Sequence, residues 1–562
     1  MGLLSGFFGS LRRAWSATTW GLAEFTWRRA RYDTVEIELS GAFPERWAAQ
    51  SPLQLMRPRS MSHRDLLDLL NHLAGDDRVR RVILSFGPMA TGLARIQELG
   101  RALDRLRAAG KEIVANIESM IGTREYLLAA RCSRRVMAPS AMLALTGFNM
   151  ELTYLRGLLD KADVEPELLV AGKYKNMAET FMRKSASRAA SEMTEGLLDE
   201  LYGQLLDDLG EALGKKKAAV AKLVDGGPYS AERARQAGLV DELLYRDELL
   251  DSMDAGHEKK IVQGRRYGRF VQRHQRRRAR MIGAPVVALV HVTGAIRDGR
   301  GDAGRGMPGA GGYVRLFRKI RRNSAVKAVV LRVSSPGGVA GGSDLMRREL
   351  QLLAAAKPLV VSMGDVAASG GYMIAVPGKM ILAERGTLTG SIGVVAGKFA
   401  ISGLLAKLGI NVESHRRGDA AGVFSGMSRF SEIERKRMTE IIKSSYESFK
   451  GTVAEGRGMS KRKINAVAEG RVWTGSEALA GGLIDDLGGL GDALQKAKDL
   501  AGGVEGEPVR LWELPVVPGP WRMLLSMGEA RVELPSPLNR IEIWREMAAG
   551  PYAGLPFELD LR

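Results

Sequence analysis

Cysteine is almost absent from this sequence: Cys132 is the only one among 562 residues. An intrachain disulfide and a zinc site built from several cysteines are therefore excluded. Histidine is also scarce, and the 6 histidines show neither the spacing of metal ligands nor an evident place in a Ser-His-Asp triad. The sequence thus predicts neither a metal nor another cofactor.

Residues 1–33 contain no uninterrupted apolar run of the length that crosses a bilayer. Apolar and aromatic residues are interrupted by Arg12 and Arg13, and this basic pair follows the apolar start, in the opposite order to a simple signal peptide. Tryptophans flanked by arginines favour a segment that lies in the membrane interface. Two alternatives stay open: an amphipathic helix packed on its own protein, and a short tilted span from Ala14 to Trp27.

Acidic residues are missing from one strongly basic stretch, 259–280, which carries much of the formal net charge of +19. We expect this block, within residues 256–283, to form a solvated linker that could also lie on anionic lipid. Binding to nucleic acid is disfavoured because Tyr267 and Phe270 are the only aromatic residues there, too few for a base-stacking platform.

Apolar runs alternate with helix-like segments, which predicts an α/β fold. This pattern occurs twice: the strand V-R-R-V-I-L-S-F at Val79 is answered by V-K-A-V-V-L-R-V at Val326, and Tyr126 is answered by Tyr372. Equivalent residues occur in the same order in both halves, and their separation in the sequence changes slowly along the chain, as small deletions in a duplicated domain would produce. The chain is therefore predicted to be a tandem duplication.

The duplication divides a chain that is too long for one hydrophobic core. We expect an N-terminal α/β domain at 34–255 and a C-terminal α/β domain at 284–505, joined by the basic linker at 256–283. The membrane-associating segment 1–33 precedes them, and a tail at 506–562 has no assigned role.

A serine stands at a predicted strand-to-helix junction in the second domain. The stretch S-M-G-D-V-A-A-S-G-G-Y-M-I-A, residues 362–375, follows the apolar run 358–361 and places Ser369 before Gly370 and Gly371. The hydroxyl would lie at the positive end of a helix dipole, beside glycines that let another backbone approach. Ser369 is therefore either an ordinary helix N-cap or a nucleophile.

The two domains differ around this junction. The second domain has Gly337 and Gly338 after a strand, where the first has Met89 and Ala90, and T-R-E replaces S-G-G at the serine position. Backbone N–H groups of a bare Gly-Gly turn can bind an oxyanion, and we expect Met89 and Arg124 to hinder that approach. Only the second domain keeps a plausible nucleophile and oxyanion site.

The first domain keeps lysines that the second lacks. Lys173 and Lys175 follow an apolar strand, whereas the corresponding residues 415–421 contain no lysine. A serine needs a base to become a nucleophile, and a lysine can serve where burial lowers its pKa. The complementary losses predict one composite site with Lys175 and Ser369 as members, although Lys175 alone would be an ordinary surface lysine.

Five spaced motifs accompany these residues: S-P-G-G at 335–338, G-D-V-A-A-S-G-G-Y at 364–372, T-L-T-G-S-I-G at 387–393, G-R-V-W-T-G at 470–475 and Y-K-N-M-A-E-T-F at 174–181. In their order along the chain, these motifs resemble those of signal peptide peptidase A, also called protease IV, in its long double-domain bacterial form. The resemblance covers about residues 34–500.

The resemblance implies a Ser–Lys dyad, with Ser369 as the nucleophile and Lys175 as the general base. Ser391 matches a serine that orients the lysine. Gly370 and the loop at 337–338 would supply the N–H groups that bind the oxyanion. The implied fold is a tandem duplication of the crotonase and Clp-protease type of α/β domain.

The resemblance also implies a membrane-associated homo-oligomer, often a tetramer, that degrades cleaved signal peptides through an acyl-enzyme. It would contact membrane lipid and peptides, at the periplasmic face of the bacterial inner membrane. Two other classes stay open: a crotonase-type enzyme that acts on acyl-CoA thioesters, and a catalytically idle membrane scaffold. The former usually relies on carboxylates for proton transfer, and the latter gives no physical reason to keep Ser369 and Lys175.

Overall fold

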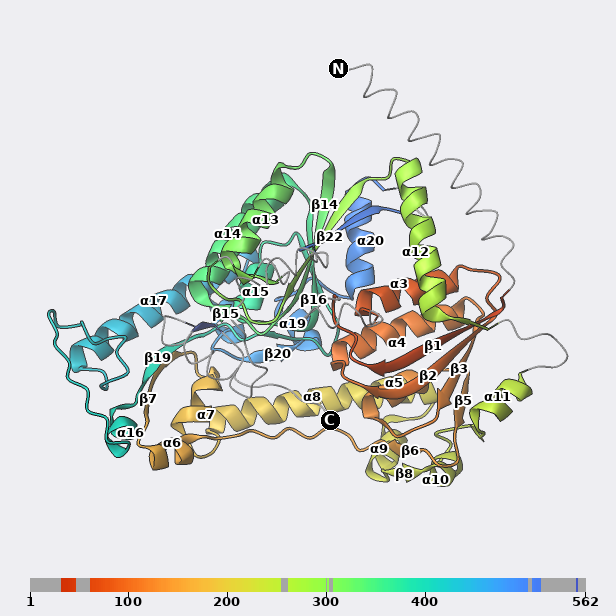
Figure 1. Ribbon diagram of the computed structural model, residues 1–562, viewed down its shortest axis with the longest axis horizontal. Helices are drawn as coiled ribbons and strands as arrows, with labels where there is room; N and C mark the ends of the chain where they lie inside the picture. The colour runs from red at the N-terminus through yellow and green to blue at the C-terminus, as the bar shows by residue number, and fades with distance from the viewer. Residues whose placement is uncertain are drawn as a thin grey trace, which may run out of the picture.

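The computed structural model describes residues 32–46, 61–253, 261–299, 301–302, 307–503, 508–516 and 552–553. Apart from residues 32 and 33, the segment expected to associate with the membrane lies outside these ranges. No helix within the ranges is both long and apolar enough to cross a membrane. The fold is α/β, with one mainly parallel sheet in each half of the chain (Figure 1).

The first half contains a parallel sheet with the strand order β10-β1-β2-β3-β5-β9. Its strands read as nearly continuous apolar runs because helices cover both faces of a parallel sheet. The elements of this half are β1 (Thr34–Gly41), α3 (His63–Ala74), β2 (Arg81–Met89), α4 (Leu93–Ala108), β3 (Glu112–Ile117), β4 (Ile121–Gly122), α5 (Thr123–Ala129), β5 (Arg134–Met137), β6 (Met142–Ala144), α6 (Arg156–Ala162), β7 (Glu165–Ala171), the 3₁₀ helix η1 (Asn176–Ala178), α7 (Glu179–Met182), α8 (Arg188–Leu213), α9 (Lys217–Asp225), β8 (Tyr229–Ser230), α10 (Ala231–Gln236), β9 (Glu242–Leu243), α11 (Arg246–Ser252), β10 (Ile261–Gln263) and α12 (Gly264–Met281).

The second half contains a sheet with the order β20-β18-β16-β14-β11-β22, in which β16 also pairs with β17, and β17 with β21. The elements of this half are β11 (Val286–Thr293), β12 (Gly301–Asp302), β13 (Met307–Pro308), α13 (Ala310–Arg322), β14 (Val326–Ser335), β15 (Gly338–Val339), α14 (Ala340–Ala356), β16 (Leu359–Ala368), α15 (Gly370–Ala375), β17 (Met380–Ala383), β18 (Leu388–Gly390), β19 (Val394–Ala400), α16 (Ser402–Lys407), α17 (Glu432–Gly456), α18 (Lys461–Val467), β20 (Val472–Thr474), α19 (Gly475–Gly481), β21 (Asp486–Leu487), α20 (Leu490–Leu500), β22 (Arg510–Leu514) and β23 (Tyr552–Ala553).

The two sheets have the same connectivity. The path β10-β1-β2-β3-β5-β9 of the first half corresponds to β22-β11-β14-β16-β17-β21 of the second. The small sheet β4-β6-β8 corresponds to the end of β16 with β18 and β20, including the antiparallel final pair. The predicted α/β class and tandem duplication are therefore confirmed.

The expectation of a solvated linker needs correction, and the tail without an assigned role contains a strand. Residues 261–281, expected to be a solvated linker, form the edge strand β10 and the helix α12, which buries Tyr267, Val271 and Ala279. Helical spacing of these apolar residues among the arginines explains the packing. Residues 510–514 of the expected tail form β22 at the equivalent edge of the second sheet. The domain boundaries themselves stay predictions.

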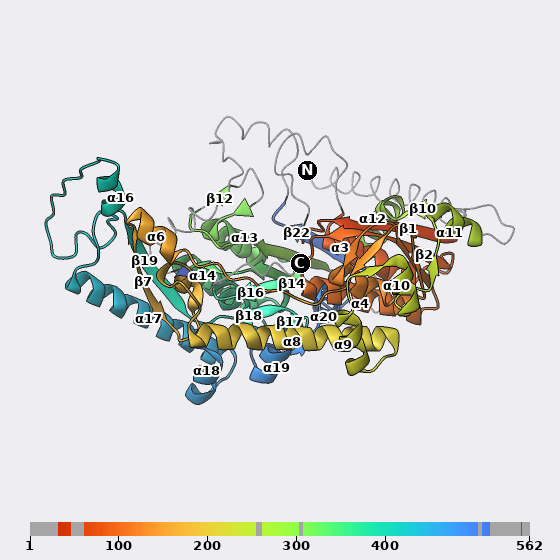
Figure 2. The same cartoon turned by 90° about the horizontal axis from the view of Figure 1, so that it is seen from below.

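The two halves share a hydrophobic core. One cluster joins first-half residues such as Leu66 and Leu99 to second-half residues such as Val330 and Leu490. Helix α8 of the first half extends beneath the second half, where Met193 and its neighbours pack against β18 and β20 (Figure 2).

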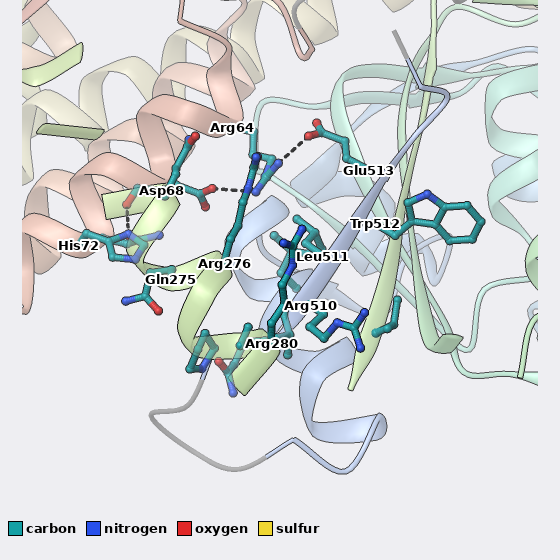
Figure 3. A pocket seen from close by; sticks show the side chains of 18 of the residues that line it. Arg64, Asp68, His72, Gln275, Arg276, Arg280, Arg510, Leu511, Trp512 and Glu513 are labelled. Carbon is teal, nitrogen blue, oxygen red and sulfur yellow. Dashed lines mark hydrogen bonds and ion pairs between the residues drawn. The ribbon is translucent and has the colours of Figure 1, made fainter. Parts of the chain in front are cut away.

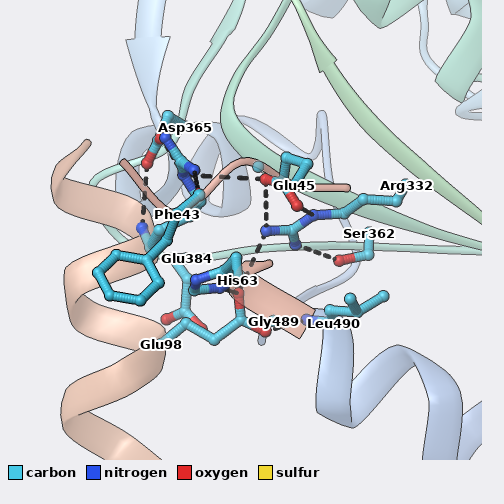
Figure 4. Close-up of polar contacts among 12 residues, drawn as sticks. Phe43, Glu45, His63, Glu98, Arg332, Ser362, Asp365, Glu384, Gly489 and Leu490 are labelled. Carbon is cyan, nitrogen blue, oxygen red and sulfur yellow. Dashed lines mark hydrogen bonds and ion pairs between the residues drawn. The ribbon is translucent and has the colours of Figure 1, made fainter. Parts of the chain in front are cut away.

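A buried group of ion pairs also crosses this junction. The guanidinium of Arg332 on β14 donates to both carboxylate oxygens of Glu45 at 3.0 Å and to Glu98 on α4 at 3.2 Å (Figure 4). It also donates to Ser362 Oγ at 2.7 Å. His63 contacts Glu98 at 2.9 Å, and every one of these side chains is buried. The orientation of the halves is therefore fixed by charge as well as by apolar packing.

A second connection between the halves is a pair of antiparallel strands. β7 of the first half pairs with β19 of the second, from Ala171 opposite Val394 to Glu165 opposite Ala400. Lys175 follows the end of β7, and Ser391 precedes the start of β19. Because the strands are antiparallel, both residues lie at the same end of the pair.

Candidate active site

Ser369 occupies a sharp turn between β16, which ends at Ala368, and α15, which begins at Gly370. Its φ of +54° lies in the left-handed region that few non-glycine residues adopt, and such strain gathers at functional sites. Its backbone N–H donates to Gly390 O at 2.7 Å, which holds the turn. The side chain makes no capping hydrogen bond to α15, so its hydroxyl is not used as an N-cap.

The Ser369 hydroxyl meets a lysine from the other half of the chain. Lys175 Nζ lies 2.9 Å from Ser369 Oγ, 2.9 Å from Ser391 Oγ and 3.2 Å from Ser391 O. Ser369 and Ser391 have no exposed surface, and Lys175 is 2% exposed. The structure thus brings together Lys175 and Ser369, the predicted members of the composite site, with Ser391, whose role the resemblance implied.

Burial changes the acid–base behaviour of this lysine. Because an ammonium group loses its hydration in the protein interior, the pKa of Lys175 falls from 10.5 to about 7. Near neutral pH a large share of the molecules therefore carry a neutral amine with a free lone pair. Lys173 differs: its side chain is 60% exposed and donates to Tyr174 Oη at 3.1 Å, outside the site.

A loop of the second half fixes the lysine loop. Glu469 O accepts a hydrogen bond from Tyr174 N at 2.7 Å, and Glu469 Oε2 accepts one from Lys173 N at 3.0 Å. The other carboxylate oxygen accepts from Tyr446 Oη at 3.1 Å, and Glu469 itself has a φ of +56°. A Cβ atom on Gly470 would lie 2.6 Å from Lys175 N, so the glycine permits this close approach.

Sequence reasoning missed Glu469 and Tyr446. The motif that begins at Gly470 was recognised, and its glycine is the only local signal of a close backbone contact. Nothing in the sequence connects Tyr446 on α17 with a loop of the first half.

The predicted oxyanion loop lies beside the serine turn. A Cβ atom added to Gly370 would lie 3.3 Å from Gly338 N, so these two backbones are in close contact. Gly338 also forms a bridge to Ile296, where any side chain would collide with the Ile296 backbone. Gly337 N already donates to Ser335 Oγ at 3.2 Å, so this N–H has an internal partner.

The equivalent place in the first half is filled by a carboxylate. Glu125 accepts hydrogen bonds from Met89 N at 2.7 Å and from Gly122 N at 2.8 Å. Met89 and Arg124 were expected to hinder the approach of an anion, but it is the Glu125 side chain that takes up the backbone donor. Thr123, at the serine position, is buried and accepts from Thr146 N at 3.3 Å.

A short strand lies next to the serine turn. β23 is antiparallel to both of its neighbours, β15 and β19, with Tyr552 opposite Val339 and Val395. An extended segment therefore fits between the glycine loop and the strand that leads away from Ser391. Among the described residues, no group of His, Cys, Asp and Glu side chains could hold a metal ion.

Comparison with known proteins gives a consistent result. The model of Peptidase family S49 matches the chain twice, at residues 105–260 and 351–503. The chain is 34% identical over 502 residues to the chloroplastic serine protease SPPA of Arabidopsis thaliana, covering 88% of this chain and 73% of that protein. It is 31% identical over 457 residues to Protease 4 of Salmonella typhi, covering 78% and 73% of the two chains.

Protease 4 of Haemophilus influenzae is 28% identical over 463 residues, with coverage of 79% and 74%. Among solved structures, a ClpP1 mutant from Listeria monocytogenes covers 37% of this chain at 16% identity with a TM-score of 0.24. With a family model that matches each half, and relatives that match most of the chain, the chain belongs to Peptidase family S49 in its double-domain form and is a serine protease.

Proposed function

We propose that the protein is an endopeptidase that works through a Ser–Lys dyad, with Ser369 as the nucleophile and Lys175 as the general base. The observation that carries this proposal is the 2.9 Å contact between Lys175 Nζ and Ser369 Oγ inside a buried site. The lowered pKa of Lys175, caused by burial, supports the same assignment, because a base must be neutral to accept a proton.

In the first step, Ser369 Oγ attacks the carbonyl carbon of the scissile peptide bond while Lys175 Nζ takes the hydroxyl proton. The carbonyl oxygen becomes an oxyanion, and the N–H groups of Gly370 and Gly338 stabilise it. The Lys175 ammonium then gives its proton to the leaving nitrogen, and the peptide bond breaks. An ester between Ser369 and the acyl part of the substrate remains.

In the second step, a water molecule attacks the ester carbonyl, and Lys175 takes one of its protons. Collapse of the intermediate releases the carboxylic acid and returns the proton to Ser369 Oγ. Ser391 Oγ, at 2.9 Å, holds the amine in line during both steps. Gly337 shapes the oxyanion loop, since its own N–H is already bound to Ser335.

The substrates in this proposal are extended, mainly apolar peptides such as cleaved signal peptides. Support comes from β23, which lies as an added strand between β15 and β19, beside the serine turn. A substrate bound in this way would gain backbone hydrogen bonds only if it were unfolded. Hydrolysis should therefore be faster for an apolar peptide than for a charged one of equal length, and folded proteins should resist. Equal rates for the two peptides would contradict the substrate assignment.

Association with a membrane surface is part of the same proposal. It is supported by α12, whose exposed side is rich in arginine and free of acidic residues. Washing membranes with concentrated salt should release the protein if it lies on the surface. Retention after both salt and carbonate washes would instead favour a true anchor.

Labelling with a serine-directed phosphonate tests the dyad. Wild type should react and lose activity, whereas Ser369→Ala should neither react nor cleave peptides. Lys175→Ala should also be inactive, and Lys173→Ala is the matched control because this exposed neighbour lies outside the site. The double variant should be barely worse than either single one, because the two residues act as a unit. Labelling of Ser369→Ala, or normal cleavage by Lys175→Ala, would overturn the proposal.

A further inference from the structure

A pocket of about 990 Å³ lies at the junction of the two halves, away from the serine turn. The helices α3 and α12 of the first half form one wall, and β22 and α20 of the second half form the other (Figure 3). Its base is partly apolar, with Ala279 and Leu511 among the lining residues. The polar side chains around it determine what it can bind.

Three arginines supply the charge of this pocket. Arg276 and Arg280 come from successive turns of α12, and Arg510 comes from β22. All three are exposed, and they line the pocket from both walls, two from α12 and one from β22 (Figure 3). Across the described part of the chain, none of them forms an ion pair with a carboxylate. Arg276 and Arg280 are four residues apart on one helix and repel each other, and a bound anion would relieve this repulsion.

The acidic residues of the pocket do not neutralise these arginines. Asp68 and Glu513 are both bound to Arg64, at 2.9 Å and 2.6 Å (Figure 3). Glu513 also contacts His291 at 3.0 Å. Four arginines and two carboxylates therefore line the pocket, which leaves it with an excess of positive charge.

We propose that this pocket binds a phosphate-bearing anion, either free in solution or as the headgroup of an acidic lipid. Guanidinium groups bind phosphate oxygens through paired N–H donors, and a multiply charged anion can engage more than one of them. Gln275 and Gln495 also line the pocket and add neutral amide donors. Such a ligand would touch both halves at once and would stabilise their junction.

The binding test uses the full-length protein and two probes. Inorganic pyrophosphate is titrated by calorimetry, and vesicles of phosphatidylcholine with or without phosphatidylglycerol are used for co-sedimentation. The pocket variant combines Arg276→Gln, Arg280→Gln and Arg510→Gln. The charge-matched control combines Arg265→Gln, Arg269→Gln and Arg273→Gln, which are exposed on α12 and do not line the pocket.

The pocket variant should bind its probe at least about tenfold more weakly for each arginine that contacts the phosphate. The control should bind pyrophosphate nearly as the wild type does, and it should lose less vesicle binding than the pocket variant. Loss of pyrophosphate binding would identify a soluble ligand, and loss of vesicle binding alone would identify a lipid headgroup. Bound pyrophosphate should also raise the melting temperature of the wild type but not of the pocket variant.

Equal losses in the pocket variant and the control would overturn the proposal, because they would show only a general attraction to positive charge. Binding of both probes by the pocket variant at wild-type strength would overturn it as well. The melting temperatures of the variants without a probe verify that both have folded. This is expected because the substituted side chains are exposed.

Discussion

Tyr126 and Tyr372 occupy equivalent positions in the two halves, and each donates a hydrogen bond of 2.7 Å to a backbone carbonyl oxygen. The acceptors, Leu239 and Leu483, are themselves equivalent in the repeat. The same holds for two aspartates: Asp241 accepts from a backbone N–H of β5 at 2.7 Å, and Asp485 from one of β17 at 2.8 Å. Both halves thus kept the contacts that build the fold.

The pH dependence of cleavage should follow the ionisation of Lys175. Because burial lowers the pKa of this lysine to about 7, kcat/KM should rise with pH and level off as the amine becomes neutral. The measurement is a rate profile from about pH 6 to about pH 9 on a peptide without ionisable groups. Lys173→Ala should give the same profile, and a wild-type rate that stays constant across this range would rule out a buried lysine base.

Ser391→Ala should slow turnover by about ten- to a hundredfold, or roughly 1–3 kcal/mol in the barrier. The variant removes the hydroxyl at 2.9 Å from Lys175 Nζ but keeps the Ser391 carbonyl, which lies at 3.2 Å. Residual activity is therefore expected, together with normal phosphonate labelling at long times. If Ser391→Ala were as inactive as Ser369→Ala, the nucleophile would have been assigned to the wrong serine.

Lys175→Met should abolish activity but stabilise the fold at neutral pH. Between about pH 7 and its ordinary pKa of 10.5, the lysine is protonated in the unfolded chain and neutral in the folded one, so wild-type stability rises with pH. The gain for the variant at pH 7 should reach up to about 4 kcal/mol, since each pKa unit corresponds to about 1.4 kcal/mol. Two serine hydroxyls that lose a partner will reduce it.

Denaturant unfolding of both proteins near pH 7 and near pH 10 measures this effect. The advantage of Lys175→Met should shrink at the higher pH, because near pH 10 the lysine begins to lose its proton in the unfolded chain as well. A difference between the two proteins that does not depend on pH would argue against a buried neutral amine.

Glu469→Ala should reduce kcat and shift the pH profile, because the Glu469 carboxylate positions the lysine loop through Lys173 N and is itself held by Tyr446 Oη. Water that enters a loosened site would move the pKa of Lys175 back toward its ordinary value. Glu469→Gly is the informative companion, since glycine tolerates the φ of +56° while lacking the carboxylate. The Ala variant should be the more impaired, and a wild-type pH profile in both would exclude a positioning role.

Arg332→Met should destabilise the protein by about 3–5 kcal/mol, because it removes the buried cation that pairs with both Glu45 and Glu98. Burial alone would raise the pKa of Glu45, and Arg332 is the main reason why it is instead lowered to about 2. Arg81→Met, which removes a more exposed pair with Glu112, should cost only about 0–1 kcal/mol. Equal losses for the two variants in denaturant unfolding would show that the buried network does not secure the junction.

Much of the candidate site could be predicted from the sequence because its local chemistry is visible there. The apolar run before Ser369 and the two glycines after it predicted a turn from strand to helix, and β16 and α15 confirm it. Lys175 needed a different argument, since no local pattern separates it from an exposed lysine. The comparison of the two halves singled out Lys175 together with Lys173, because the corresponding residues of the second half include no lysine.

Other features depend on contacts that leave no local trace. Arginines dominate the sequence of α12, so the sequence predicts a solvated linker where Tyr267 and Val271 in fact pack against the protein. β22 is short, and only pairing with β11 stabilises it as a strand. The role of Glu125 leaves no local trace either, because the hydrogen bond that it accepts from Met89 N joins the end of β2 to the first turn of α5.

The pairing of β7 with β19 also has a consequence for the order of synthesis. A ribosome completes Lys175 well before Ser369 and Ser391, and the last of these follows the lysine by 216 residues. In the proposed mechanism, a nascent or truncated chain that ends before β19 holds a base without its nucleophile in place. The proposed mechanism therefore predicts that the topology of the chain prevents self-digestion during translation, because the dyad forms only when the later half has folded onto the earlier one.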